Sequence, residues 1–354
     1  MIDFPADCGC LSGMYKSAII GVSGPRANEH AEAYAHIERA ALVAASTRNE
    51  ESLKAFVARH GIEHGYTDYR KMFAEQKPDL VHVNTPPNVR VEVLEAAIEH
   101  GIPAIIFEKP IALSFEDLAR IRELDAQGRC KVAVNHQLHF HPNRFSLQEK
   151  VAKGVIGEVT HVDVSSRLNV VHQGTHVLQA IAAFIPGSKA VSVKASASGI
   201  EGLVENPRHH YAPDQVQAEI VYDNGVKATL TCGPDAPSVD GANEINHHKR
   251  IAVKGTEGEM LWSMWGWQLT TSEGESSGKH DYFEEDVLGQ AAMVESMINW
   301  IEDDAHAMPL CLDKALGDFE IVMGMYQSVI HNRIIEFPLQ PEPDILGKIR
   351  EGLK

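Results

Sequence analysis

Short apolar runs alternate with longer segments of mixed polarity through the first third of the chain. The apolar runs have the length and composition of buried strands, and the segments between them have the spacing of helices with one apolar face. The predicted strands are residues 17–22, 41–46, 79–84, 103–107 and 131–135. The predicted helices are residues 28–37, 50–60, 89–100 and 114–126. This alternation predicts βαβ units in a doubly wound parallel sheet, the α/β architecture of a Rossmann domain.

The pattern changes near residue 136, after which strand-like stretches become more numerous. The predicted strands are residues 158–166, 190–197, 215–222, 226–232, 249–253 and 262–270. The predicted helices are residues 142–153, 174–184, 288–304 and 312–331. Asp223-Asn224-Gly225 separates two of these strands and is a strong hairpin signal. The second half therefore predicts an α+β fold with a largely antiparallel open sheet covered by helices.

These patterns divide the chain into three regions. Residues 1–13 are expected to form a flexible N-terminal extension. Residues 14–136 are expected to bind a dinucleotide, and residues 137–354 to bind substrate and to mediate oligomerisation.

Net charge and cysteine content argue against several functional classes for this protein. The 354 residues carry a formal net charge of −17, which argues against nucleic acid or an anionic membrane as the partner. No apolar run approaches the length needed to span a bilayer, and residues 1–16 lack the apolar core of a secretory signal. Five cysteines without regular spacing do not suggest disulfides, so we expect a cytoplasmic protein. Cys8 and Cys10 have no second pair to complete a zinc site, and no metal is predicted.

A glycine-containing loop joins the first predicted strand to the first predicted helix. A dinucleotide site requires glycines at this point so that the backbone can approach the pyrophosphate. Read as G-x-G-x-x-G/A, Gly24 and Ala27 fit the motif, whereas Val22 occupies the first glycine position. A plain strand-to-helix turn is the alternative interpretation. The residues of this loop predicted to bind the cofactor are Gly21, Ser23, Gly24, Pro25, Arg26 and Ala27.

The end of the second predicted strand bears on the choice of nicotinamide cofactor. NAD enzymes often place a carboxylate there to accept from the ribose 2′-hydroxyl. This chain has Ser46, Thr47 and Arg48 instead, which suit a 2′-phosphate. The sequence therefore favours NADP over NAD, with Arg48 at a solvated helix start as the alternative.

Glu108-Lys109-Pro110 follows the predicted strand 103–107 directly. Ligands of open parallel sheets bind at that exit. An alcohol that loses hydride must also lose a proton, and a lysine near its oxygen stabilises the developing negative charge. The alternative is a surface lysine paired with Glu108.

Five features together resemble the glucose–fructose oxidoreductase/inositol dehydrogenase (Gfo/Idh/MocA) family. They are the glycine loop before His30-Ala31-Glu32-Ala33-Tyr34, Thr85-Pro86-Pro87-Asn88, Glu108-Lys109-Pro110, Gly154-Val155-Ile156-Gly157 and Gly174-Thr175-His176. The resemblance implies that Lys109 lies beside the nicotinamide and the reacting carbon, with Pro110 in the cis form. It also adds Thr85, Pro86, Pro87, Asn88, Glu108 and Lys109 to the predicted cofactor site.

The family resemblance further implies that His176 accepts the substrate proton. His172 stands where the family has an aspartate, a departure from its Asp-x-x-x-His pattern. An α-helical spacing of four would put both imidazoles on one face, where they could share a proton, or His172 could bind a substrate hydroxyl. A metal pair and a changed reaction are further alternatives, although no Glu follows His172 to complete H-E-x-x-H. A structural role is the alternative for His176.

Polar residues near the middle of the chain are candidates for contact with substrate. Their many neutral donors and acceptors suit a polyhydroxylated ligand such as a sugar or cyclitol, with solvated loop residues as the alternative. The predicted substrate-binding residues are Lys109, Asn135, Gln137, His139, Arg167, Asn169, His172 and His176. Trp262, Trp265 and Trp267 are expected in sheet packing or at a subunit interface.

The sequence thus predicts an NAD(P)-dependent oxidoreductase of sugars, cyclitols or related polyols. One alternative is a glycoside-cleaving enzyme that uses transient oxidation and elimination with recycled NAD(P). The other is a non-catalytic sensor that binds dinucleotide. The resemblance also suggests a homodimer or homotetramer, because an uncovered apolar face of the second sheet would need a partner.

Overall fold

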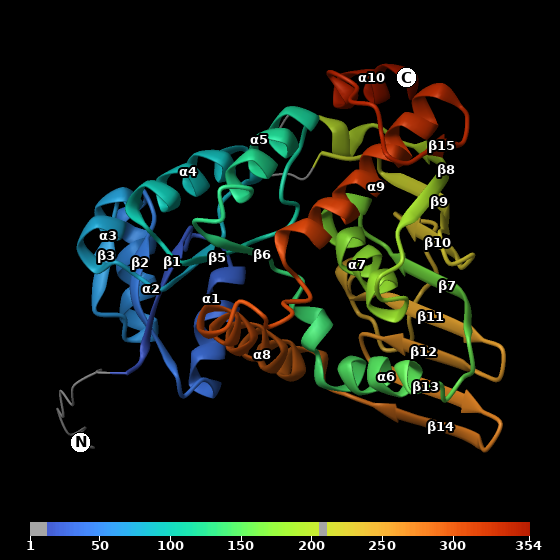
Figure 1. Ribbon diagram of the computed structural model, residues 1–354, viewed down its shortest axis with the longest axis horizontal. Coiled ribbons are helices and arrows are strands. Elements are labelled where there is room, and N and C mark those ends of the chain that lie inside the picture. The colour runs from blue at the N-terminus through green and yellow to red at the C-terminus, as the bar shows by residue number, and fades with distance from the viewer. Residues whose placement is uncertain (1–12, 205–210) are drawn as a thin grey trace.

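The computed structural model describes residues 13–204 and 211–354. Six parallel strands form its first sheet, in the order β3-β2-β1-β4-β5-β6 (Figure 1). They are β1 (Tyr15–Ile20), β2 (Ala40–Ser46), β3 (His64–Tyr66), β4 (Leu80–Val83), β5 (Ala104–Phe107) and β6 (Lys131–Val134). The strand order reverses between β1 and β4, and ligands of open α/β sheets bind outside the carboxyl ends of the strands at such a point.

Helices cover both faces of the first sheet. Helices α3 (Tyr69–Gln76), α4 (Arg90–His100) and α5 (Phe115–Asp125) pack on one face. Helices α1 (Arg26–Glu32), α2 (Glu50–His60) and α8 (Tyr282–Glu302) pack on the other. Met293 and Met297 of α8 belong to the same apolar cluster as Leu80 and Ile106 of the sheet. A helix from the last quarter of the chain therefore lies beside α1 and brings late residues to the first sheet (Figure 1).

The ends of several helices follow from local side-chain chemistry. The side chain of Asn49 accepts a hydrogen bond from the Ser52 amide at the start of α2, and Ser114 caps α5 in the same way. Gly61 and Gly101, with φ of 64° and 69°, end α2 and α4 in the left-handed conformation that glycine adopts without strain. These predicted helix limits are confirmed.

Nine strands form the second sheet, in the order β14-β13-β12-β11-β7-β10-β9-β8-β15. They are β7 (Val159–Ser166), β8 (Ala190–Ser198), β9 (Gln215–Tyr222), β10 (Lys227–Cys232), β11 (Arg250–Gly255), β12 (Glu259–Ser263), β13 (Gly266–Thr271), β14 (Gly274–Lys279) and β15 (Ile335–Glu336). Every neighbouring pair is antiparallel except β7 with β10. The predicted combination of a parallel Rossmann sheet with a largely antiparallel second sheet is confirmed.

Helices lie against one face of the second sheet. Helix α7 (Thr175–Phe184) packs on β7 and β11, and α9 (Leu312–His331) packs on β8 (Figure 1). Helix α6 (Pro142–Ala152) lies beside α7, and α10 (Ile345–Gly352) packs on α9. His176 is the second residue of α7, so the packing of the start of this helix sets where the His176 side chain lies.

The predicted strand 262–270 is wrong. It is a hairpin of β12 and β13 that reverses at Met264-Trp265, and Trp262 pairs with Trp267 across it. Trp262 is fully buried, so it packs in the sheet. Helix α8 begins at Tyr282, before the predicted residue 288, because the Asp281 side chain caps its amides.

Five elements have no counterpart among the predictions: β3, α3, β14, β15 and α10. Each is short, and β14 has no large apolar residue to give a periodic signal. Its strand character comes from backbone pairing with β13. Pairing with a neighbour is a tertiary property that the local pattern does not encode.

The exposed face of the second sheet is polar, which corrects the expectation of an uncovered apolar face. Lys227 pairs with Glu219 at 3.8 Å, and Arg250 pairs with Asp163, all on residues facing outward. The alternation along these strands places apolar side chains toward α7 and α9. Burial of apolar surface therefore gives no argument for a partner on this face.

The predicted N-terminal extension lies almost wholly outside the described residues, as do Cys8 and Cys10. Among residues 13–204 and 211–354, no helix is both long enough and apolar enough to cross a bilayer. The cytoplasmic location and the domain boundaries stay predictions.

Candidate active site

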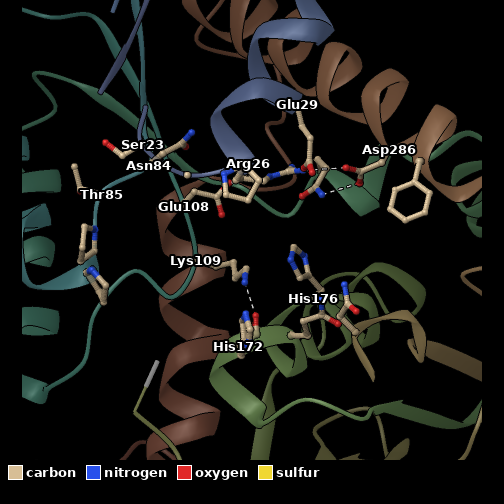
Figure 2. Close-up of a pocket in the computed structure, with 18 of the residues that line it drawn as sticks. Ser23, Arg26, Glu29, Asn84, Thr85, Glu108, Lys109, His172, His176 and Asp286 are labelled. Atoms are coloured by element: carbon tan, nitrogen blue, oxygen red, sulfur yellow. Dashed lines mark hydrogen bonds and ion pairs between the residues drawn. The ribbon is translucent and has the colours of Figure 1, made fainter. Parts of the chain in front are cut away.

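A cavity of about 970 Å³ lies where the first sheet faces the start of α7 and of α8. Ser23, Asn84 and Lys109 reach it from the carboxyl ends of β1, β4 and β5. His176 reaches it from α7, and Asp286 from α8 (Figure 2). Residues far apart in sequence thus meet at the point where the strand order of the first sheet reverses.

The glycine loop after β1 forms one wall of the cavity through Ser23, Gly24, Pro25 and Arg26. Gly21 does not line the cavity. It has φ of 89°, and a Cβ added there would lie 2.9 Å from backbone atoms of Asn84, so glycine permits the close approach of this loop to β4.

Two other residues of the loop motif have contrasting surroundings. A Cβ added at Gly24 would meet no atom within 4 Å, so the loop leaves open space on its cavity side. Ala27 is instead 1 % exposed in the apolar cluster under α1 and contributes packing.

Arg26 connects the loop to three carboxylates. Its guanidinium lies 2.9 Å from Asp286, 3.3 Å from Glu108 and also pairs with Glu29 (Figure 2). Burial by itself would lower the pKa of Arg26, but these three carboxylates raise it above its ordinary value. Arg26 is therefore a fixed cation whose charge is already matched by the protein.

Glu108 is held as a carboxylate by several donors. Oε1 lies 3.0 Å from His30 Nε2 and 2.6 Å from the Asn135 amide nitrogen, in addition to its contact with Arg26. Burial would raise the pKa of Glu108, but the His30 hydrogen bond and the Arg26 charge hold it well below its usual range. Asn135 thus contacts Glu108 and does not line the cavity.

Lys109 extends from the end of β5 into the cavity (Figure 2). Its Nζ donates to the backbone carbonyl of His172, and the Lys109-Pro110 peptide is cis, as the resemblance implied. The pKa of Lys109 is lowered to about 8, chiefly by burial and also by the charges of Arg26 and Arg90, against the opposing charge of Glu108. Since Glu108 is bound elsewhere, Lys109 is not the surface partner of that carboxylate.

His176 lies in the same cavity and is 7 % exposed. Its ring stands edge-on to that of His136, with centroids 5.2 Å apart. Burial holds the pKa of His176 well below its ordinary value, and the charge of Lys109 adds to this effect. The imidazole is therefore neutral near pH 7 and able to accept a proton.

His172 does not have the α-helical relation to His176 that the spacing predicted. Residues Val170–Gly174 form a π-helical turn, whose Asn169 side chain accepts from the His172 amide at 2.8 Å. The wider turn changes the angle between positions 172 and 176. The His172 side chain is exposed at the cavity rim, and its carbonyl is the group that meets Lys109.

Most of the remaining predicted site residues line the cavity, and several do not. Those that line it are Thr47, Arg48, Thr85, Pro86, Pro87 and Gln137. Those that do not are Ser46, Asn88, His139, Arg167 and Asn169.

The structure gives these five residues other surroundings. Ser46 is buried at the end of β2, and Asn88 is exposed outside the cavity. The His139 ring is hydrogen-bonded to the Gln179 side chain, Arg167 donates to the Ala236 carbonyl, and the Asn169 side chain accepts from the His172 amide.

Sequence reasoning missed two polar residues beside the β4 exit, Asn84 and Arg90, which line the cavity together with the predicted Thr85. Within the described part of the chain, both Asn84 side-chain polar atoms, Thr85 Oγ1 and two Arg90 nitrogens have no hydrogen-bond partner. Buried polar groups normally have partners, so these orphaned atoms indicate a ligand. The position of Arg90 at the start of α4, three residues after Pro87, was an available signal for this residue.

Other missed residues come from the second half of the chain. Lys249, Tyr282 and Asp286 line the cavity, although each lies outside any motif. A prediction that started α8 at Tyr282 instead of residue 288 would have included Tyr282 and Asp286 in this helix. The sequence around Lys249 contains no motif that would have identified this residue.

Comparison with known protein families finds a match for the first domain. Residues 15–136 match the model of the GFO_IDH_MocA oxidoreductase family, described as an NAD-binding Rossmann fold. The first domain of the chain therefore matches the NAD-binding domain of the Gfo/Idh/MocA oxidoreductases. This match confirms the predicted resemblance and supports an oxidoreductase with an NAD-binding first domain.

Relatives of the family match much more of the chain. Inositol 2-dehydrogenase of Rhizobium meliloti is 24 % identical over 324 residues, covering 86 % of this chain and 94 % of that protein. D-Apiose dehydrogenase of Paraburkholderia graminis is 24 % identical over 266 residues, covering 70 % and 68 %. The crystal structure of an NAD-binding oxidoreductase from Klebsiella pneumoniae matches with a TM-score of 0.78 and 18 % identity, covering 93 % of this chain and 100 % of that one. The shared fold thus extends over both sheets.

Proposed function

We propose that this protein oxidises or reduces a CH–OH group of a sugar, cyclitol or related polyol with a nicotinamide dinucleotide. The observation that carries the proposal is that Lys109 and His176, from separate halves of the chain, line one cavity together with the glycine loop. The family relatives named for inositol and apiose support a polyhydroxylated substrate.

The cavity residues fit a dinucleotide. Gly24 leaves open space on the loop, and Asn84, Thr85 and Arg90 offer polar atoms without protein partners. Ser23 and Thr47, whose hydroxyls lie 3.3 Å apart, and the exposed Arg48 are available to the adenosine half. When bound, the nicotinamide ring supplies a carbon that accepts or donates hydride.

The protein's own part in the reaction is to manage the proton and the charge on the substrate oxygen. In the oxidation direction, neutral His176 takes the hydroxyl proton. The Lys109 ammonium stabilises the negative charge that develops on the same oxygen. The hydrogen bond to the His172 carbonyl fixes where the ammonium lies, because it orients the lysine toward α7. In reduction the same groups act in reverse.

We also propose a preference for NADP over NAD. Support comes from the absence of a carboxylate among Ser46, Thr47 and Arg48 and from the exposure of Arg48 at the cavity. Among the described residues, Arg48 forms no ion pair, so its guanidinium is available to a phosphate.

A substrate panel tests the function. The wild-type protein is incubated with sugars, aldonic acids and cyclitols, each with NAD⁺ and with NADP⁺, and the absorbance of reduced nicotinamide is followed. Turnover of at least one polyol that Lys109→Met abolishes is the expected result. Release of sugar from a glycoside without net reduction would favour the elimination alternative, and binding of dinucleotide without any turnover would favour the sensor.

We propose in addition that the protein is a homodimer or homotetramer assembled through the outward face of the second sheet. The support is the width of this uncovered face and its paired charges, such as Asp163 with Arg250, which suit a polar contact. Light scattering coupled to size exclusion measures the subunit number, and a monomer at micromolar concentration would refute the proposal.

A further inference from the structure

A second lysine lies in the cavity without a role in the reaction described above. Lys249 directly precedes β11, lines the cavity and is 3 % exposed. Its Nζ lies 5.0 Å from the centroid of the Tyr282 ring. Among residues 13–204 and 211–354, this ammonium has no hydrogen-bond or ion-pair partner, although a buried cation is costly without one.

The carboxylates of the cavity are already engaged. Asp286 is close enough to raise the pKa of Lys249, but its Oδ2 lies 2.9 Å from Arg26 and its Oδ1 accepts from the Gln137 amide at 2.8 Å. Glu29 and Glu108 also pair with Arg26. All three carboxylates thus direct an oxygen to Arg26, and within the described residues none of them forms a hydrogen bond or ion pair with Lys249, although Asp286 and Glu29 attract it at longer range.

The charge state of Lys249 is consistent with a missing anion. The pKa of Lys249 is lowered to about 7, chiefly by burial and also by the charges of Lys109 and Arg26, against the attraction of Asp286 and Glu29. A negatively charged ligand group would restore the ammonium form. Lys249 comes from the second sheet beside Tyr282 and Met264, whereas the residues proposed to hold the dinucleotide come from the first sheet, so the anion belongs to the substrate.

We infer that Lys249 recognises a carboxylate of the substrate, and that the substrate class is therefore a sugar acid or another polyhydroxy acid. This inference rests on the proposed function. Oxidation of such a substrate converts one hydroxyl-bearing carbon to a carbonyl: hydride leaves to the oxidised nicotinamide, the hydroxyl proton goes to His176, and the carboxylate is unchanged. A carboxylate suits a single ammonium better than a phosphate does, because phosphate sites usually combine several donors or an arginine fork.

Matched pairs of substrates test the assignment. D-Glucose and D-galactose are compared with D-gluconate, D-glucuronate and D-galacturonate, and glucose 6-phosphate represents the other anion. The expected result is a kcat/KM at least tenfold higher for an acid than for its neutral counterpart, in line with roughly ten- to hundredfold for one hydrogen bond to a charged group.

Three variants connect this selectivity to Lys249. In Lys249→Met the ratio of acid to neutral kcat/KM falls toward one, whereas Lys249→Arg keeps a ratio above one because it keeps the charge. Lys254→Met removes an exposed lysine of β11, the strand that Lys249 precedes, and retains the wild-type ratio. NADH affinity, measured by fluorescence, checks that each variant is folded and binds dinucleotide.

The outcomes separate the inference from the proposed function. Turnover of neutral polyols without preference for acids, or preference for the phosphorylated sugar, would overturn the inference and leave the oxidoreductase assignment standing. A loss of NADH affinity in Lys249→Met equal to the loss of acid turnover would overturn it too, by assigning Lys249 to the cofactor. If no substrate is turned over, the proposed function fails, and the inference is then tested by the binding of gluconate to the complex of the protein with NADH. Binding to wild type that is lost in Lys249→Met supports the inference. No binding to wild type refutes the inference.

Discussion

The ammonium of Lys109 donates a hydrogen bond to the backbone carbonyl of His172, four residues before His176. This contact joins the exit of the first sheet to the π-helical turn that leads into α7. The two groups that carry the proposed reaction, the Lys109 cation and the neutral His176 base, are therefore placed relative to each other by a main-chain atom. The identity of the side chain at position 172 does not determine that contact.

We expect substitution of Lys109 to separate charge from proton transfer. Lys109→Met lowers kcat/KM about a hundredfold or more, because the developing charge on the substrate oxygen loses its cation. Lys109→Arg keeps the charge and retains more activity. His172→Asn keeps the backbone carbonyl and serves as the comparison, with a smaller loss than Lys109→Met. Steady-state kinetics with the best polyol measure all three, and equal losses for the methionine and arginine variants would contradict a role of charge.

The pH dependence of kcat/KM follows from two shifted groups. The pKa of Lys109 is lowered to about 8, so its charged form is lost, and activity falls, as pH rises through that value. The pKa of His176 lies well below 6.5, so the base stays neutral and no decline is expected between pH 7 and about pH 6 from this group. In Lys109→Arg the alkaline decline disappears because arginine stays protonated. An alkaline limb that persists in this variant would assign it to another group.

A buried chain of hydrogen bonds fixes the protons around Glu108. His30 Nε2 faces the Glu108 carboxylate at 3.0 Å and must carry the proton, so His30 Nδ1 accepts from His82 Nδ1 at 3.0 Å. His82 Nε2 then accepts from the Tyr34 hydroxyl at 2.8 Å. Nitrogen NMR of the two rings is expected to report these neutral tautomers, and an imidazolium at either position at pH 7 would refute the assignment.

The buried histidines of this hydrogen-bond network, His30 and His82, also predict how the free energy of unfolding depends on pH. Burial lowers the pKa of His30 and of His82, so below about pH 6.5 the unfolded chain binds protons that the folded chain does not. The free energy of unfolding therefore decreases as pH falls from 6.5, and it is fully retained above that value. Urea unfolding of wild type and of His82→Asn measures the slope, which is expected to be shallower in the variant. His36→Asn, at an exposed position, is expected to keep the wild-type slope.

Two glycines of the same loop are expected to respond oppositely to alanine. Gly21→Ala meets backbone of Asn84 at 2.9 Å with φ of 89°, so it destabilises folding by about 1–3 kcal/mol. Gly24→Ala meets no protein atom and leaves stability nearly unchanged, but its methyl group lies where the dinucleotide is proposed to bind and weakens NADH affinity. Urea unfolding and fluorescence titration distinguish the two effects. Unchanged NADH affinity in Gly24→Ala would contradict the proposed cofactor position.

Cofactor preference tests the end of β2. Arg48→Ala is expected to lower kcat/KM about tenfold with NADP⁺ and much less with NAD⁺, because only the former has a 2′-phosphate to pair with arginine. Lys54→Ala, at an 80 % exposed position on α2, leaves the ratio unchanged. Equal effects of Arg48→Ala on the two cofactors would remove the argument for NADP.

Five of the six strands of the first sheet were predictable because each lies in a continuous apolar run, whereas β3 (His64–Tyr66) has no such run and was not predicted. The limits of α2 and α5 follow from Asn49, Gly61 and Ser114, whose effects act within one turn of chain. The hairpin of β12 and β13 was predicted as one strand because its turn, Met264-Trp265, contains none of the residues that usually mark a reversal.

By itself, the sequence determined the parallel sheet and placed Lys109 at the end of β5, because hydrophobic periodicity and capping are local and the exits of parallel strands share one edge. Only the tertiary structure decided that α8 returns to the first sheet, that Asp286 matches Arg26, and that Lys249 has no hydrogen-bond or ion-pair partner among the described residues. The first two relations join residues more than a hundred positions apart, and all three depend on how packed layers bring charges together around one cavity.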